Sequence, residues 1–151
     1  MVIVLLGILA AVGAPMIANG MRIATTGSTG LDTLSQLRYA TERLARELRE
    51  IESVGGVYTV NTGTGTFTKT DGTVVTISYA SPNVTINYAG TGSASLTNQA
   101  SAFSLSYLDI TGAAGATAST LRFVEVLLTL TSPTTGASYT QRTRVAMRNT
   151  G

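Results

Sequence analysis

The chain contains no cysteine and no histidine. Without cysteine it has no disulfide, no thiolate nucleophile and no sulfur ligand for zinc. Without histidine it lacks the side chain that most often serves as a general base or as a ligand for transition metals. No G-x-S-x-G motif occurs either. We therefore expect no catalytic, cofactor-binding or metal-binding site and no small-molecule substrate, and we interpret the chain as not being an enzyme.

Charged residues are also scarce: they make up 12% of the 151 residues, and the net charge is +2. So small a net charge gives the chain no polyelectrolyte character, which argues against nucleic acid as a partner. The charges are unevenly placed. Residues 1–18 carry none, and ten lie within residues 22–52, namely Arg22, Asp32, Arg38, Glu42, Arg43, Arg46, Glu47, Arg49, Glu50 and Glu52.

The chain begins with a long apolar run, from Met1 to Ala18. As a helix this run would span about 27 Å, close to the roughly 30 Å of a bilayer's hydrocarbon core. It lacks the basic n-region of a cleavable signal peptide, and it continues directly into a helical pattern. An apolar surface of this size needs lipid or copies of itself as a partner. We predict three parts: a transmembrane or filament-core helix half (1–21), an amphipathic helix half (22–54) and a globular β-sheet domain (55–151).

Small residues recur at intervals of four within the apolar run, a spacing that lets helix backbones approach closely in lipid. We expect them to form helix–helix contacts on assembly: Gly7, Ala10, Ala11, Ala14 and Ala18.

Four positions favour a kink or local melting of the helix. Pro15 removes one backbone donor, and each of Gly20, Gly27 and Gly30 costs about 1 kcal/mol relative to Ala in a helix interior. We predict that residues 25–30 are where the helix loosens.

Residues 31–53 have the pattern of an amphipathic helix, which Gly55-Gly56 would stop after Ser53. Ion pairs are expected on its outer face at Arg38/Glu42, Glu42/Arg46, Arg43/Glu47 and Arg46/Glu50. Its apolar side is a heptad-like stripe, with Thr41 filling a gap, that we expect to pack on a sheet: Leu34, Leu37, Leu44, Leu48 and Ile51.

Beyond Gly56 the period changes to two, which is typical of strands. Asp71-Gly72 predicts a hairpin turn, and residues 89–101 and 111–120 are interpreted as loops. We expect one antiparallel sheet, with the helix stripe as its cover. The predicted strands are 66–69, 73–79, 84–88, 103–107, 121–131 and 138–147.

The segment Gly7-Ile8-Leu9-Ala10-Ala11-Val12-Gly13-Ala14-Pro15 resembles the N-terminal helix of type IV pilins and of type II secretion pseudopilins. In that family the mature chain begins with an aromatic residue and Thr-Leu-Ile/Val-Glu, followed by an apolar run with this glycine and proline spacing. Aligning Gly7 and Pro15 on the pattern places Met1 at an internal position, with several family residues upstream. No residue of this sequence therefore takes the role of the family's glutamate, which pairs with the neighbouring subunit's N-terminus.

Three later segments are similar to strands of minor pseudopilins of the J type and of the mannose-sensitive hemagglutinin pilus cluster. They are Phe103 to Asp109, Arg122-Phe123-Val124-Glu125-Val126 and Thr143 to Asn149. The resemblance implies an α+β, pilin-like fold, in which the apolar half of a long N-terminal helix projects and its amphipathic half packs on the antiparallel sheet.

The resemblance also implies a place and a partner. The subunit would wait in the inner membrane with its C-terminal domain outside the cytoplasm, then assemble with copies of itself, or with other pilins or pseudopilins, into an extracellular helical filament. Charge bias alone, with Arg22 beside the apolar run, favours a cytoplasmic C-terminal side. The family's basic leader on the other flank reverses that bias.

The remaining polar residues favour structural roles. Asp71 and Asp109 lack the spacing of a calcium site, so we interpret them as turn caps. Arg142, Arg144 and Arg148 share one strand face without interleaved aromatic residues, which favours a solvated or intersubunit role over DNA binding.

Three functions remain open at this stage. The first is a structural subunit of a type IV pilus-like filament. The others are a minor pseudopilin of a secretion or pilus-tip complex, and a monomeric membrane-anchored module whose β domain binds a surface ligand.

Overall fold

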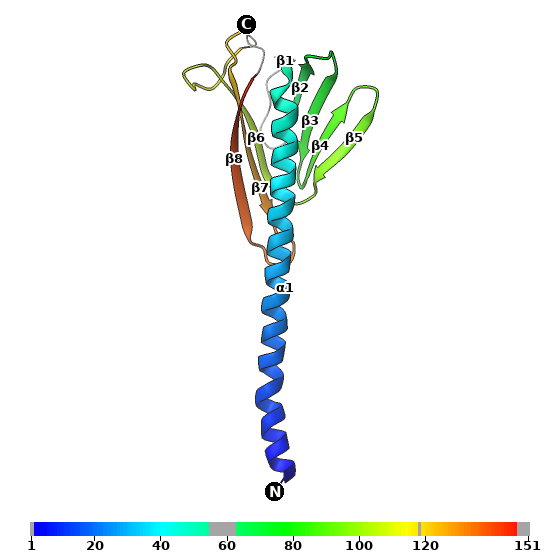
Figure 1. Ribbon diagram of the computed structural model, residues 1–151, viewed down its shortest axis with the longest axis vertical. Helices are drawn as coiled ribbons and strands as arrows, with labels where there is room; N and C mark the ends of the chain where they lie inside the picture. The colour runs from blue at the N-terminus through cyan, green and yellow to red at the C-terminus, as the bar shows by residue number, and fades with distance from the viewer. Residues whose placement is uncertain (1, 55–62, 118, 148–151) are drawn as a thin grey trace.

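The computed structural model describes residues 2–54, 63–117 and 119–147, with the side chains of residues 2–14, 53 and 54 outside that description. Within these ranges the chain forms one long helix followed by eight strands (Figure 1). The elements are α1 (Val2–Arg49), β1 (Ile51–Val54), β2 (Thr64–Lys69), β3 (Val74–Ala80), β4 (Asn83–Tyr88), β5 (Gly92–Thr97), β6 (Ala100–Leu108), β7 (Phe123–Thr131) and β8 (Ser138–Ala146).

The strands form two antiparallel sheets, of order β1-β2-β3-β4-β5 and β6-β7-β8. Figure 1 shows them on either side of the C-terminal half of α1, while the N-terminal half extends well beyond both. The coarse expectation of a long N-terminal helix packed on antiparallel strands is confirmed. The expectation of a single sheet is wrong, because β5 does not continue into the β6 ladder.

The helix ends at Arg49, earlier than the expected Ser53. Residues 51–54 pair instead with β2, where Ile51 lies opposite Lys69 and Val54 opposite Phe67. Ile51 is buried in β1, and burial was also expected for it in a helix, so its apolar character does not distinguish a last helical turn from a first strand. The predicted stop at Gly55-Gly56 lies outside the described residues.

A second correction concerns residues 92–97, which were expected to be loop. They form β5, whose Ser93 and Ala94 lie opposite Asn87 and Ile86 of β4. Glycine, serine and alanine have low strand propensity, so the pairing with β4 decides the structure here. The Asp71-Gly72 hairpin turn is confirmed between β2 and β3, and Gly72 has the positive φ that such a turn needs.

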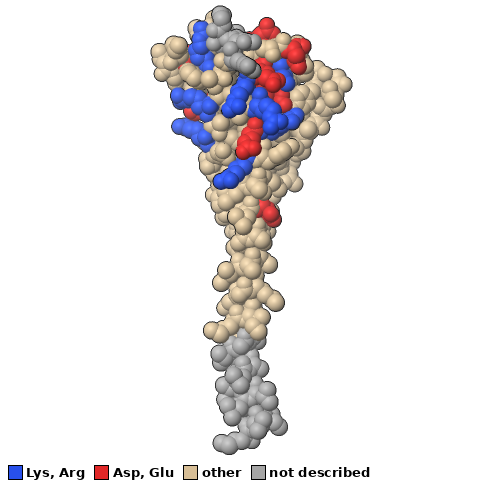
Figure 2. Space-filling model, viewed as in Figure 1, with Lys and Arg blue, Asp and Glu red and all other residues tan. Residues whose placement is uncertain are grey.

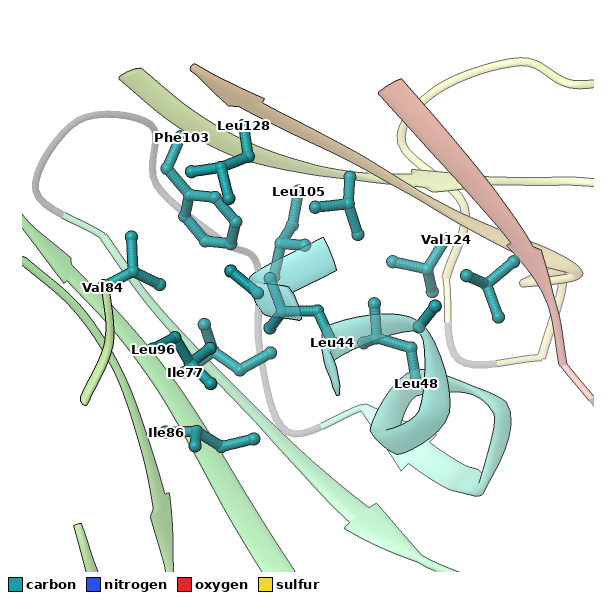
Figure 3. Packing of buried hydrophobic residues seen from close by; sticks show 14 of the residues in the cluster. Leu44, Leu48, Ile77, Val84, Ile86, Leu96, Phe103, Leu105, Val124 and Leu128 are labelled. Atoms are coloured by element: carbon teal, nitrogen blue, oxygen red, sulfur yellow. The ribbon is translucent and has the colours of Figure 1, made fainter. Parts of the chain in front are cut away.

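The core lies between α1 and the inner faces of both sheets (Figure 3). Leu44 and Leu48 of the helix point into it, and the Tyr79 and Phe103 rings meet edge to face with centroids 6.0 Å apart. This ring pair joins β3 of one sheet to β6 of the other. Each fully buried leucine or phenylalanine contributes about 1.5–3 kcal/mol, so the head has a hydrophobic core of its own.

The predicted stripe is buried at Leu37, Leu44, Leu48 and Ile51, but Leu34 is 37% exposed. The inward position at that turn is Thr33, which is 1% exposed. The strands therefore do reach this turn of the helix, and Leu34 is exposed because it lies about 100° around the helix from the buried Thr33. Thr41 fills the gap as expected: it is buried, and its hydroxyl donates to the Leu37 carbonyl at 2.7 Å.

Candidate assembly interface

We call residues 15–28 of α1 the stalk and residues 33–147 the head. Every stalk residue is exposed, and Figure 2 shows this part of the helix standing free below the head. Its large apolar side chains are mostly in solvent: Met16 is 74% exposed, Ile17 65%, Met21 67% and Ile23 74%. These four exposed side chains within residues 16–23 make the stalk a candidate interaction surface.

The predicted helix–helix contacts fall mainly below the stalk. The side chains of Gly7, Ala10, Ala11 and Ala14 lie outside the described residues, although the backbone there is helical. Ala18 lies on the stalk and is exposed. Among the residues that the structure describes, none of the helical segments combines the length and the apolarity that crossing a membrane requires.

The helix is continuous through all the positions predicted to weaken it: Pro15, Gly20, Gly27 and Gly30 lie within the single element α1. Residues 25–30 are helical as well, so their loosening stays a prediction for the assembled state.

The glycines differ in their surroundings. A Cβ added at Gly20 or Gly27 would meet no atom within 4 Å, whereas one at Gly30 would lie 3.1 Å from the Tyr139 hydroxyl. Gly30 thus allows β8 to approach the helix closely. At positions 20 and 27, by contrast, the described chain shows no contact that requires glycine.

Hydroxyl side chains in the stalk and just above it bond back to the helix. The Thr25 hydroxyl donates to the Met21 carbonyl at 3.0 Å, and those of Ser28 and Thr29 donate to the Thr25 carbonyl at 2.9 and 2.8 Å. Such bonds satisfy the hydroxyl groups without water. These three hydroxyl groups are therefore compatible with an apolar environment as well as with solvent.

Where the helix enters the head, polar side chains hold it to the end of β5 and the residues after it. Thr33 donates to Oε1 of Gln99 at 3.2 Å, and Thr97 donates to Oε1 of Gln36 at 3.5 Å. Beside this junction a groove of about 380 Å³ is lined by Leu31, Leu34, Ser35 and Arg38.

Near the other end of the helix, Glu47 is the centre of a polar network, and its side chain is 6% exposed. It accepts a hydrogen bond from the Tyr88 hydroxyl at 2.6 Å and forms ion pairs with Lys69 at 3.1 Å and Arg43 at 3.3 Å. Lys69 also contacts Glu50 at 2.6 Å. The network joins the last turns of α1 to β2 and β4 of the five-stranded sheet.

The network shifts the proton affinities of its members. The hydrogen bond from Lys69 to Glu50, assisted by the one to Glu47, raises the pKa of Lys69. The hydrogen bond to Tyr88 raises the pKa of Arg43, and burial raises the pKa of Tyr88. Both cations therefore stay charged, and the tyrosine stays neutral, at any physiological pH.

Of the four ion pairs expected along the helix, only Arg43/Glu47 forms among the described residues. It does not lie on a solvated face as predicted, because Glu47 points toward the sheet. The burial of Glu47 was therefore not predicted. Glu47 lies in a run of alternating charges, and nothing in that pattern distinguishes a buried acid from an exposed one.

The basic residues of β8 are only partly available to a partner. Glu125 of the neighbouring strand β7 forms ion pairs with both Arg142 at 3.3 Å and Arg144 at 3.1 Å. Arg148 lies outside the described residues. The solvated or intersubunit interpretation of these arginines stays a prediction.

The two aspartates act as turn caps, as predicted. Oδ1 of Asp71 accepts from the Thr73 amide at 2.8 Å, and Oδ1 of Asp109 accepts from the Thr111 and Ala113 amides at 2.8 and 2.9 Å. A hydrogen bond from the Thr111 hydroxyl, together with those from the amides, lowers the pKa of Asp109, and the hydrogen bonds from Thr73 lower the pKa of Asp71. Both carboxylates are occupied within their own turns.

Comparison with known proteins adds no family to this geometry. No protein-family model, no curated protein and no solved structure matches the chain. The functional interpretation therefore depends on the stalk and the head themselves. Within the described parts of the chain, no set of three or more acidic side chains is gathered as metal ligands would be.

Proposed function

We propose that the chain is a structural subunit of a pilus-like filament, with a pilin-like fold, which assembles through its N-terminal helix. The observation that carries the proposal is the stalk: a continuous helix whose large apolar side chains, Met16, Ile17, Met21 and Ile23, are exposed beside a head that has its own core. Before assembly the apolar helix is in the membrane. In the filament the same surface contacts copies of itself.

This mechanism involves no chemical reaction, only exchange of one apolar environment for another. Two features of the stalk favour it. The hydroxyls of Thr25, Ser28 and Thr29 are bonded to the helix itself, so these three groups keep a hydrogen-bond partner on transfer into an apolar bundle. Gly20 and Gly27 have open space around them, which lets another backbone come close.

The first experiment removes residues 1–18 from the full chain. The head keeps its core, since the buried helix residues begin at Thr33. The truncated protein should be a soluble monomer that cannot enter filaments, because the uncharged apolar run that includes Met16 and Ile17 has been removed. Electron microscopy and sedimentation measure this, and continued polymerisation would contradict the proposal.

A matched pair of substitutions tests the stalk without shortening the chain. Ile23 in the stalk and Ile110 in the loop after β6 are almost equally exposed, at 74% and 76%. Ile23→Asp should prevent filament formation, since it places a charge within the bundle, and Ile110→Asp should not. Equal effects of the two substitutions would mean that the stalk has no special role.

The same measurements distinguish the two alternatives. A minor pseudopilin at a filament tip would be present as a few copies among many of another subunit. A membrane-anchored binding module would remain as dispersed single molecules and form no fibres.

A further inference from the structure

Arg22 and Asp32 have a special place in the distribution of charge along the helix. Arg22 is the only charged side chain in the first 31 residues, and Asp32 is the first acidic residue of the chain. Both are exposed, and neither forms an ion pair within the described residues. Some charged residues of the head, such as Glu47, Lys69 and Glu125, are paired, so what distinguishes Arg22 is its place among exposed apolar side chains.

Arg22 lies between Met21 and Ile23, two of the large exposed apolar side chains of the stalk. When stalks pack side by side, water is excluded from this level of the helix. An arginine buried without a counter-ion is strongly unfavourable, and its guanidinium keeps its charge at any physiological pH. Assembly through the stalk therefore requires an acidic partner for Arg22.

The chain cannot supply that partner from its own helix. Asp32 is ten residues from Arg22, about 15 Å along the axis, whereas side chains pair along a helix at separations of three or four residues. A parallel neighbouring copy that is shifted by about 15 Å brings its Asp32 level with Arg22.

We infer that Arg22 of one copy forms an ion pair with Asp32 of a neighbouring copy, and that this pair sets the axial stagger between subunits. The inference rests on the proposed function. The two side chains point about 80° apart around the helix, so a copy uses Arg22 toward one neighbour and Asp32 toward another. Such a contact is heterologous and continues as an open series instead of closing as a dimer.

Charge reversal in the full chain tests the pair. Arg22→Glu alone places two carboxylates together at the contact, and Asp32→Arg alone places two guanidinium groups together. Each single variant should reduce the amount of filament that sediments by about tenfold or more, because like charges at an interface are repulsive. The double variant, which exchanges the two charges, should restore assembly.

A mixture of the two single variants provides the sharpest result. If copies of the two variants alternate along the series, every contact again joins a carboxylate to a guanidinium group. Two proteins that fail separately should therefore assemble when mixed at equal amounts. A defect within the isolated subunit could not be corrected in this way.

The control combines Asp32→Arg with Arg38→Glu, which has the same net charge as the double variant. Arg38 is also exposed on α1 without an ion pair in the described structure, so this combination should not restore filaments. Unchanged thermal unfolding of the single variants establishes that their heads are folded.

The outcomes separate this inference from the proposed function. If the original chain forms filaments and the single variants do so equally well, the ion pair is refuted and the filament remains. The pair is also refuted if neither the double variant nor the mixture assembles. If the original chain itself forms no filaments, the proposed function fails.

Discussion

The polar network around Glu47 allows a quantitative test of how the helix is held in the head. Glu47→Ala removes one hydrogen bond to Tyr88 and the ion pairs to Lys69 and Arg43. Removing one partner of a buried ion pair typically destabilises a protein by about 3–5 kcal/mol, since the remaining charge is left without compensation.

The expected value lies at the lower end of that range. Lys69 keeps Glu50 at 2.6 Å, and the Arg43 side chain is 37% exposed, so water can replace part of its lost interaction. We expect Glu47→Ala to lower the free energy of unfolding by about 3 kcal/mol. Glu47→Gln retains the volume and an acceptor for Tyr88, so it should lower stability by about 1–2 kcal/mol.

Thermal unfolding of the full chain in detergent, followed by near-ultraviolet circular dichroism, measures the effect. All six tyrosines follow residue 38 and the chain has no tryptophan, so this signal reports on the head and not on the stalk. For a domain of about this size, 3 kcal/mol corresponds to a decrease in Tm of roughly 10–20 °C.

Glu42→Ala is the matched control, because Glu42 is exposed on the same helix without an ion pair in the described structure. It should change stability by less than about 0.5 kcal/mol. If Glu47→Ala is no more destabilising than Glu42→Ala, the network does not hold the helix to the sheet.

Three further predictions follow from the described contacts. Gly20→Ala should stabilise the helix by about 1 kcal/mol, as its Cβ meets open space. Gly30→Ala should stabilise the helix less than Gly20→Ala does, or destabilise it, because the added Cβ would lie 3.1 Å from the Tyr139 hydroxyl. Amide hydrogen exchange in the helix measures the difference, and equal slowing in the two variants would contradict the prediction. The raised pKa of Lys69 means that its stabilisation is complete below the ordinary value of 10.5 and is lost as the pH rises through the folded-state pKa. Alkaline titration of the unfolding free energy should show that loss, Lys69→Met should reduce it, and identical profiles would refute the assignment. Asp109→Ala should accelerate hydrogen exchange at the Thr111 and Ala113 amides, whose acceptor it removes. Asp109→Asn keeps an acceptor and should change that exchange less. Unaltered exchange in both variants would exclude the turn cap.

The helix and its buried face could be predicted because they depend on local periodicity. Leu37, Leu44 and Leu48 recur at helical spacing, and all three are buried. Leu34 follows the same period but is exposed. The period identifies a face of the helix only approximately. Which side chain faces the strands at a given turn is a tertiary property, and at this turn it is Thr33, 1% exposed, and not Leu34.

The division into two sheets could not be predicted for a similar reason. Alternation identifies strands and their inward side chains, but it does not say which strands pair. Residues 92–97 have little strand propensity, and their structure depends on β4, whose Asn87 and Ile86 lie opposite Ser93 and Ala94. Context of this kind routinely overrides propensity in strands.

Glu47 was predicted on a solvated face because an ion pair with its sequence neighbour is equally possible there. Arg43 is four residues before it, and that pair does form, at 3.3 Å. The partners that make the site buried are Lys69 and Tyr88, which are 22 and 41 residues away. Contacts over such distances are invisible to an analysis of helical spacing.

The stalk departs from two general tendencies of folded proteins, namely that large apolar side chains are buried and that helices avoid glycine in their interior. In the head, apolar side chains are largely buried and most charged residues near the core are paired. In the stalk, Met16 and Ile23 are each 74% exposed, and Gly20 and Gly27 weaken a helix that does not need glycine for any contact of its own. Each of those glycines costs about 1 kcal/mol relative to alanine. Sequences depart from local consistency mainly at functional positions, so these departures support the proposed assembly through the stalk.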